Sequence, residues 1–154
     1  MSGGTISGNY YGVYVYGGAF TMSGGEISGN TAGNDGGGVY SNRSEFSMSA
    51  NSSITNNTAG HSGGGVFMGG DVFVPGGTIS GNTAPTDPEI GAKDANSIPS
   101  YTITVSGAIV GGTVTADKAS AKYGEAVTLT ATPASDDYVL DDLTVDLQGQ
   151  LTGY

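Results

Sequence analysis

A short phrase ending in asparagine recurs four times in the first half of the chain, and this repeat restricts the fold more than any other feature. The copies read MSGGTISGN, MSGGEISGN, MSANSSITNN and VPGGTISGN. Between them lies a second recurring phrase, seen as YGVYVYGGAFTM, GGGVYSNRSEFSM and GGGVFMGGDVFV. A unit repeating at this interval is typical of a solenoid, in which each repeat stacks only on its neighbours.

Each repeat contains three apolar stretches that are too short for ordinary hairpins. They fit the three sides of one coil of a parallel β-helix, in which each strand pairs with its equivalent about 4.8 Å away along the axis. We therefore predict an all-β fold with a short three-sided parallel β-helix of about three coils. The central isoleucines expected to stack are Ile6, Ile27, Ile54 and Ile79. The other side chains expected to point inward are Val13, Val15, Phe20, Met22, Val39, Phe46, Met48, Val66, Met68, Val72 and Val74.

An asparagine follows each central isoleucine by three residues. A repeated asparagine at one corner can adopt a left-handed backbone and hydrogen-bond its equivalents in adjacent coils as an amide ladder. The alternative is a set of independent turn residues that face solvent. The four asparagines are Asn9, Asn30, Asn57 and Asn82.

The composition changes near Thr83, which indicates more than one domain. Residues 1–83 are rich in Gly, Asn, Ser and Thr, and we assign them to the β-helix. The range 84–100 contains three prolines and is predicted to be a linker or a cap over the last coil. Alternating apolar residues in 101–154 predict a small antiparallel β module of four or five strands.

The formal net charge is −10, and the chain has no cysteine. Such a charge opposes binding to nucleic acid or to anionic lipid, and the missing cysteines exclude disulfides and thiolate metal sites. No apolar run approaches the roughly 20 residues of a membrane span, so we expect no membrane insertion in this segment. Its first residues do not form a signal peptide.

The GG-x-I phrases, together with GGGVY and ISGNTA, resemble the parallel β-helix repeats of bacterial surface proteins and polymorphic outer-membrane adhesins. The likeness covers roughly the first 83 residues. It implies an extracellular or cell-surface location and a structural or adhesive role. The partner implied is a glycan or a protein of a host or cell surface.

The string GGTVTADKASAKYGEAVTLTATPASDDYVLDDLTV, residues 111–145, is similar to the InlB-type B-repeat and to related bacterial Ig-like modules. Where those modules commonly have a glycine before the aromatic residue, this chain has Asp137 before Tyr138. The resemblance implies a spacer on a surface protein.

Aromatic residues gather near the first repeat. Tyr14 and Tyr40 would point outward if Val13 and Val39 point inward, with Phe67 on the following coil. Such an exposed aromatic ladder could hold sugar rings or a protein partner. The alternative is that neighbouring repeats or the linker cover it.

Four carboxylates close together suggest a calcium site, since oxygen ligands suit this cation. The alternative is ordinary acids facing solvent, and we expect no other cofactor. His61 has no second histidine or cysteine and is predicted to be a loop residue. The candidate calcium ligands are Asp136, Asp137, Asp141 and Asp142.

Many large β-helices act on polysaccharides with paired acids. Here Glu45 and Asp71 are predicted about one coil apart, and we interpret them as surface charges. The sequence thus predicts a non-enzymatic module, with a carbohydrate-binding or carbohydrate-active fragment as the alternative and ice binding as a remote one. The hydroxyls behind the ice-binding hypothesis flank the isoleucines: Thr5, Ser7, Ser28, Ser53, Thr55, Thr78 and Ser80.

Overall fold

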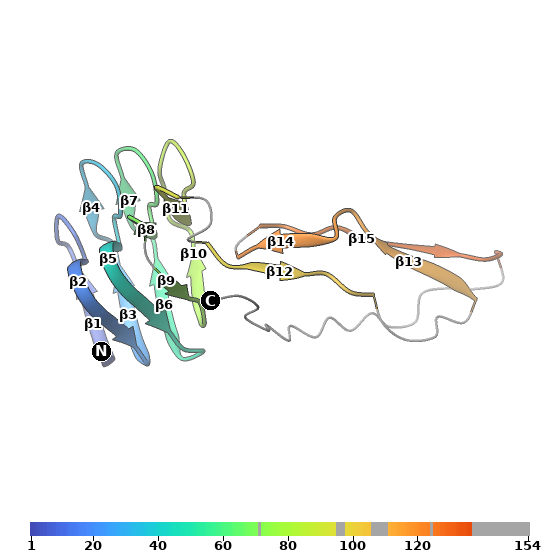
Figure 1. Cartoon of the computed structure of the whole chain (residues 1–154), viewed down its shortest axis with the longest axis horizontal. Coiled ribbons are helices and arrows are strands. Elements are labelled where there is room, and N and C mark those ends of the chain that lie inside the picture. Colours follow the sequence, from blue (N-terminus) through green and yellow to red (C-terminus); the bar gives the residue numbers. More distant parts are fainter. Residues whose placement is uncertain (71, 95–97, 106–110, 124, 137–154) are drawn as a thin grey trace. The chain divides into compact units, whose positions relative to one another are not determined.

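The isoleucine phrases of the four repeats form one parallel sheet (Figure 1). The computed structural model describes residues 1–70, 72–94, 98–105, 111–123 and 125–136. Within the sheet Ile27 lies directly between Ile6 and Ile54, and Ile79 follows Ile54. Ile27 and Ile54 are fully buried, so the sheet supplies one wall of the core. Its strands, in order, are β1 (Ser2–Ser7), β3 (Gly24–Ser28), β6 (Ser52–Thr55) and β10 (Thr78–Ser80).

A second parallel sheet carries the valine and phenylalanine phrases. Val39 pairs with Val13 on one side and with Val66 on the other, and Ile90 pairs with Val66. The two sheets stack equivalent residues of successive repeats, which confirms the predicted parallel β-solenoid of about three turns. The strands are β2 (Val13–Met22), β5 (Val39–Met48), β8 (Val66–Met68), β9 (Val72–Val74) and β11 (Ile90–Ala92), with β8 and β9 both paired to β5.

The sequence predicted that the first two apolar stretches of each repeat form separate strands. In the first two coils they instead form one ten-residue strand. A left-handed residue lies inside each, Gly17 with φ of 73° and Arg43 with φ of 54°. Pairing continues on both sides of this position. The left-handed residue therefore turns the chain around a corner while the ladder of hydrogen bonds is kept.

The third repeat is shifted by one residue from the predicted register. Phe46 pairs with Phe73, so Val72 aligns with Glu45 and Val74 aligns with Ser47. Phe73 is 2% exposed, and its ring stacks on that of Phe46 with centroids 5.2 Å apart. The ring of Phe20 stacks on the ring of Phe46 as well, with centroids 5.5 Å apart. Stacking of like aromatic rings explains the register, because a ring buries more apolar area than valine.

Short strands close the third side of the coil. β4 (Thr31–Ala32) and β7 (Thr58–Ala59) pair in parallel, and Thr58 also bridges to Thr83. The range 84–100, predicted to be a linker or cap, contains β11 and a bridge between Thr86 and Ser62. Part of this range therefore stacks on the third coil.

The four asparagines form a continuous column along the solenoid, in which Asn9 is exposed and the other three are buried. The side-chain amide of Asn9 donates to Oδ1 of Asn30 at 3.1 Å, Asn30 donates to Asn57 at 2.9 Å, and Asn57 donates to Asn82 at 3.1 Å. In Asn9, Asn30 and Asn57, the backbone N–H donates to the same oxygen as the side-chain amide. Asn30 and Asn57 are fully buried, so they are not independent residues facing solvent. We call this column the amide ladder.

The left-handed backbone predicted for these asparagines belongs instead to the residue before each of them. The φ angles are 65° at Gly29, 56° at Asn56 and 68° at Gly81. This preceding residue turns the chain at the corner of the coil. The asparagine side chain that follows then reaches its equivalent in the adjacent coil. The asparagine itself then needs no left-handed conformation.

Glycine is required where the next segment passes beside the amide ladder. A Cβ added to Gly38 would lie 2.7 Å from Cγ2 of Ile54 and 2.9 Å from Nδ2 of Asn57. The carbonyl of Gly65 accepts from Val39, and the carbonyl of Glu89 accepts from Val66 in the same way. Glu89 therefore occupies, in the last coil, the position that Gly38 and Gly65 occupy in the preceding coils. Its carboxylate accepts a hydrogen bond from Nδ2 of Asn82 at 2.6 Å. This carboxylate ends the amide ladder.

In the second unit, Ser100–Tyr154, the described residues form two antiparallel pairs, β12 with β14 and β13 with β15, where one sheet of four or five strands was predicted. Lys118 and Glu125 form an ion pair at 2.8 Å. Burial raises the pKa of Tyr123 and of Tyr101. The strand expected around Val145 lies outside the described residues. The strands are β12 (Ser100–Thr102), β13 (Gly112–Ala116), β14 (Ser120–Lys122) and β15 (Leu129–Pro133).

Replacing Asn57 with alanine should lower the free energy of unfolding by about 3 kcal/mol or more, because it leaves buried polar groups of Asn30 and Ile27 without partners. Guanidinium unfolding followed by circular dichroism would measure the loss. The matched control is Asn56→Gly, which introduces the residue found at Gly29 and should change stability by less than about 1 kcal/mol. Equal effects of the two substitutions would contradict a stabilising amide ladder.

Candidate functional site

Three aromatic side chains stack on the outer face of the second sheet. The rings of Tyr14 and Tyr40 lie 4.9 Å apart and 6° from parallel, and those of Tyr40 and Phe67 lie 5.6 Å apart at 15°. All three occupy equivalent positions in β2, β5 and β8, where strand register places one above another. Tyr14 is 54% exposed, and the two others are half-buried. We call this set the aromatic ladder.

Two further tyrosines lie beside the ladder. The ring of Tyr11 is tilted by 62° to Tyr14 and by 58° to Tyr40, with centroids 5.4 and 6.0 Å away. Tyr10 meets Tyr11 edge to face at 4.9 Å. Tyr11 therefore lies beside the ladder and is not one of its stacked rings.

The position of Tyr10 and Tyr11 follows from a short connection in the first coil. Six residues separate Ile6 from Val13, whereas eleven separate Ile27 from Val39. Strands β4 and β7 lie in the longer connections, and the corresponding part of the first coil is Asn9–Gly12. Tyr10 lies against Gly33 of the longer connection in the second coil.

The tyrosines form one side of an open hollow of about 280 Å³. Its other side comes from the longer connections, which contribute Asn34, Asp35 and His61. Nδ1 of His61 lies 2.8 Å from Oδ1 of Asp35. We call this the tyrosine hollow, and its lining residues are Tyr11, Tyr14, Asn34, Asp35, Tyr40 and His61.

The pairing of His61 with Asp35 was missed by the sequence prediction of an ordinary loop histidine. The two residues lie in neighbouring coils, within the aligned phrases TAGND and TAGHS. The backbone N–H of His61 donates to the carbonyl of Asn34, which fixes the two loops side by side. Alignment of these phrases therefore contains the signal for the pair.

Tyr11 has a perturbed acidity. Burial raises the pKa of its phenol, and the neighbouring Tyr10, Tyr14, Tyr40 and Asp35 act in the same direction, because their negative charge would repel a phenolate. Tyr11 is therefore a neutral hydrogen-bond donor at physiological pH.

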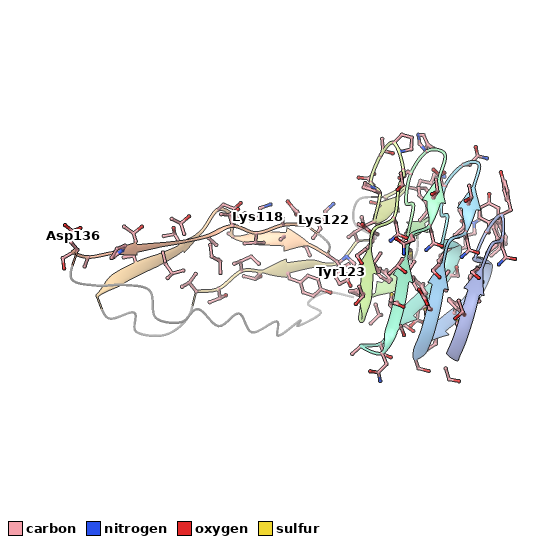
Figure 2. All side chains as sticks on the ribbon, turned by 180° about the vertical axis from the view of Figure 1, so that it is seen from behind. Lys118, Lys122, Tyr123 and Asp136 are labelled. Atoms are coloured by element: carbon pink, nitrogen blue, oxygen red, sulfur yellow. The ribbon has the colours of Figure 1, made fainter. Side chains whose placement is uncertain are left out.

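The four acids suggested as calcium ligands are only partly described. Asp136 follows β15 and lies at the end of the second unit away from Lys118, Lys122 and Tyr123 (Figure 2). Asp137, Asp141 and Asp142 lie outside the described residues. Among the residues that the structure describes, no group of three or more His, Cys, Asp or Glu side chains could hold a metal ion. The calcium site remains a prediction.

The acids of the solenoid have separate surroundings. Glu26 accepts a hydrogen bond from Thr55 at 3.2 Å in the first sheet, whereas Glu45 is exposed in the second sheet. Asp71, the predicted neighbour of Glu45, lies outside the described residues. Register places Glu26 between Thr5 and Ser53, so a carboxylate interrupts one of the two hydroxyl columns beside the isoleucines.

Comparisons with protein-family models, with curated proteins and with solved structures give no match for this chain. Across the described residues, no helix has the length and apolar character needed to span a membrane. The aromatic ladder and the tyrosine hollow are therefore the features from which a function can be proposed.

Tyrosine labelled with ¹³C at Cζ should show Tyr11 ionising above the ordinary phenol pKa of 10.0 in the folded chain and near it in urea. The folded chain binds the phenolic proton of Tyr11 more tightly than the unfolded chain does. This difference contributes to the free energy of unfolding in full below pH 10, and the contribution is lost as pH rises through the pKa of the folded state. Tyr10→Phe should change the Tyr11 titration only slightly, because burial is the larger cause. A Tyr11 resonance that titrates at a lower pH in the folded chain than in urea would contradict this assignment.

Proposed function

We propose that the chain is a non-enzymatic structural and adhesion module of a bacterial cell-surface or secreted protein. The solenoid presents the binding face, and the second unit serves as a spacer. The observation that carries the proposal is the aromatic ladder, a column of outward rings stacked on a repetitive scaffold.

The aromatic ladder suits binding because its side chains lose little conformational freedom when a partner arrives. Tyr40 is already held between Tyr14 and Phe67, so its rotamer is restricted before binding. Exposed tyrosines combine a large apolar area with a polar hydroxyl, and such residues are common in binding surfaces. Tyr10, Tyr14 and Tyr16 are each more than half exposed.

Surface location is proposed from the resemblance of the two parts of the chain. The GG-x-I repeats resemble those of bacterial surface β-helices, and the segment 111–145 resembles B-repeat spacers. The net charge of −10 favours a neutral or basic partner over nucleic acid or anionic lipid. The partner proposed is a glycan or a protein of a host or cell surface.

A carbohydrate-active fragment is the second candidate, and the His61–Asp35 pair beside the tyrosines favours it. A carboxylate that orients a histidine is a common arrangement in general-base catalysis. Incubation of the chain with neutral and uronic-acid polysaccharides should release no reducing ends if the module only binds. Release that disappears in an Asp35→Asn variant would replace the adhesion proposal with an enzymatic one.

Beads coated with the full chain should adhere under flow to a surface of immobilised desialylated mucin, a heavily glycosylated protein from which the acidic sialic acids have been removed. The double variant Tyr14→Thr, Tyr40→Thr should lose most of this adhesion, because it removes the ladder while threonine keeps a high β-strand propensity. Retention of beads at increasing shear gives the measurement. The matched control is Tyr16→Thr, an exposed tyrosine of the same strand that lies outside the ladder.

Adhesion of the control with loss in the double variant would support the ladder as the binding face. Equal adhesion of the double variant and the unmodified chain would exclude it. Circular dichroism of each variant shows whether the β-structure is retained.

A further inference from the structure

We infer that the tyrosine hollow binds a single ring of a neutral carbohydrate. The inference rests on the proposed function, since it gives a ligand class to part of the same binding face. It follows from three properties of the hollow: an aromatic ring inclined to the stacked pair, polar side chains in the same lining, and an acid with no lysine or arginine beside it.

The aromatic wall suits the C–H face of a sugar ring. Tyr14 and Tyr40 cover each other's facing surfaces at 4.9 Å, so this pair contributes mainly ring edges and hydroxyls. Tyr11 lines the hollow and is inclined to both rings by about 60°, so it does not stack face to face with either. A sugar ring has an apolar face of C–H groups that can pack on such a ring, with its hydroxyls directed sideways.

The same geometry disfavours an organic cation such as a quaternary ammonium. Recognition of a quaternary ammonium typically uses an aromatic cage, in which several ring faces surround the charge. Ring edges carry partial positive charge, and the stacked pair of Tyr14 and Tyr40 presents edges. One inclined ring, Tyr11, does not make an aromatic cage.

The polar wall can satisfy sugar hydroxyls in both directions. Asp35 is held by His61 at 2.8 Å and, as a carboxylate, has further lone pairs that accept from hydroxyl groups. Asn34 offers both an amide donor and a carbonyl acceptor, and the neutral phenol of Tyr11 can donate. Hydroxyls that leave water therefore find partners, which a hydrophobic partner surface would leave unsatisfied.

Charge excludes acidic sugars. The lining residues include Asp35 but no lysine or arginine, and the whole chain carries a net charge of −10. A uronate, sulfate or phosphate group would be repelled by Asp35, with no lysine or arginine in the lining to offset the repulsion. The volume of about 280 Å³ lies at the lower limit for small-molecule sites, which suits one ring of a longer glycan.

Saturation-transfer NMR on the full chain tests the inference, since it detects the millimolar affinities expected of an open single-ring site. The probes are methyl glycosides of glucose, galactose, mannose and N-acetylglucosamine, with galacturonic acid and choline chloride as charged comparators. At least one neutral glycoside should receive saturation on its ring C–H protons. Binding by galacturonic acid or choline in preference to every neutral glycoside would overturn the inference, as would the lack of any signal from the neutral glycosides.

Two variants of lining residues and one control variant test whether the sugar binds in the tyrosine hollow. Tyr11→Leu removes the inclined ring but keeps apolar bulk, and Asp35→Ala removes the acceptor, so each should weaken binding by about tenfold. Tyr16→Leu removes an exposed tyrosine outside the hollow and should leave the signal unchanged. Unchanged binding in either folded lining variant would place the ligand elsewhere and overturn the inference.

The outcome can be separated from that of the adhesion experiment. Bead adhesion that depends on Tyr14 and Tyr40 but persists on enzymatically deglycosylated mucin would indicate a protein partner. The proposed function would then stand and the sugar inference would fail. If the unmodified chain shows neither adhesion nor sugar binding, the proposed function and the sugar inference both fail.

Discussion

The amide ladder is the interaction on which the rest of the solenoid depends. The side chains of Asn30 and Asn57 each join their own coil to the next, and each also donates to the carbonyl of an isoleucine in the preceding coil. Because Asn30 and Asn57 are fully buried, any slip between coils would leave several polar groups without partners. The cost of such a slip holds the coils in register.

Register in turn produces the two aromatic columns. The same pairing that places Phe46 between Phe20 and Phe73 in the core places Tyr40 between Tyr14 and Phe67 on the outer face. One column buries apolar area in the core, and the other leaves apolar area on the surface. Stability and the candidate binding face therefore originate in a single set of strand pairings.

Much of this architecture could be predicted from the sequence, because repeated isoleucines, valines and asparagines mark positions that must coincide in a stack. The one-residue shift at Phe73 could not, since DVFV offers valine and phenylalanine with the same alternation, and only the neighbouring rings select between them. Residues of the aromatic ladder were identified in advance by their outward alternation. The tyrosine hollow was missed because its walls come from connections of unequal length in different coils, which no local pattern displays.

Unequal connections also have an evolutionary consequence. The strands of a coil are fixed by their neighbours, whereas the segment that joins Ile6 to Val13 is shorter than its counterparts without loss of pairing on either side. A change of a few codons in one connection can therefore open or fill a depression between adjacent loops while the scaffold is preserved. In a protein of this type, insertions and deletions can alter recognition as directly as substitutions do, and paralogues with identical cores could differ in what they hold.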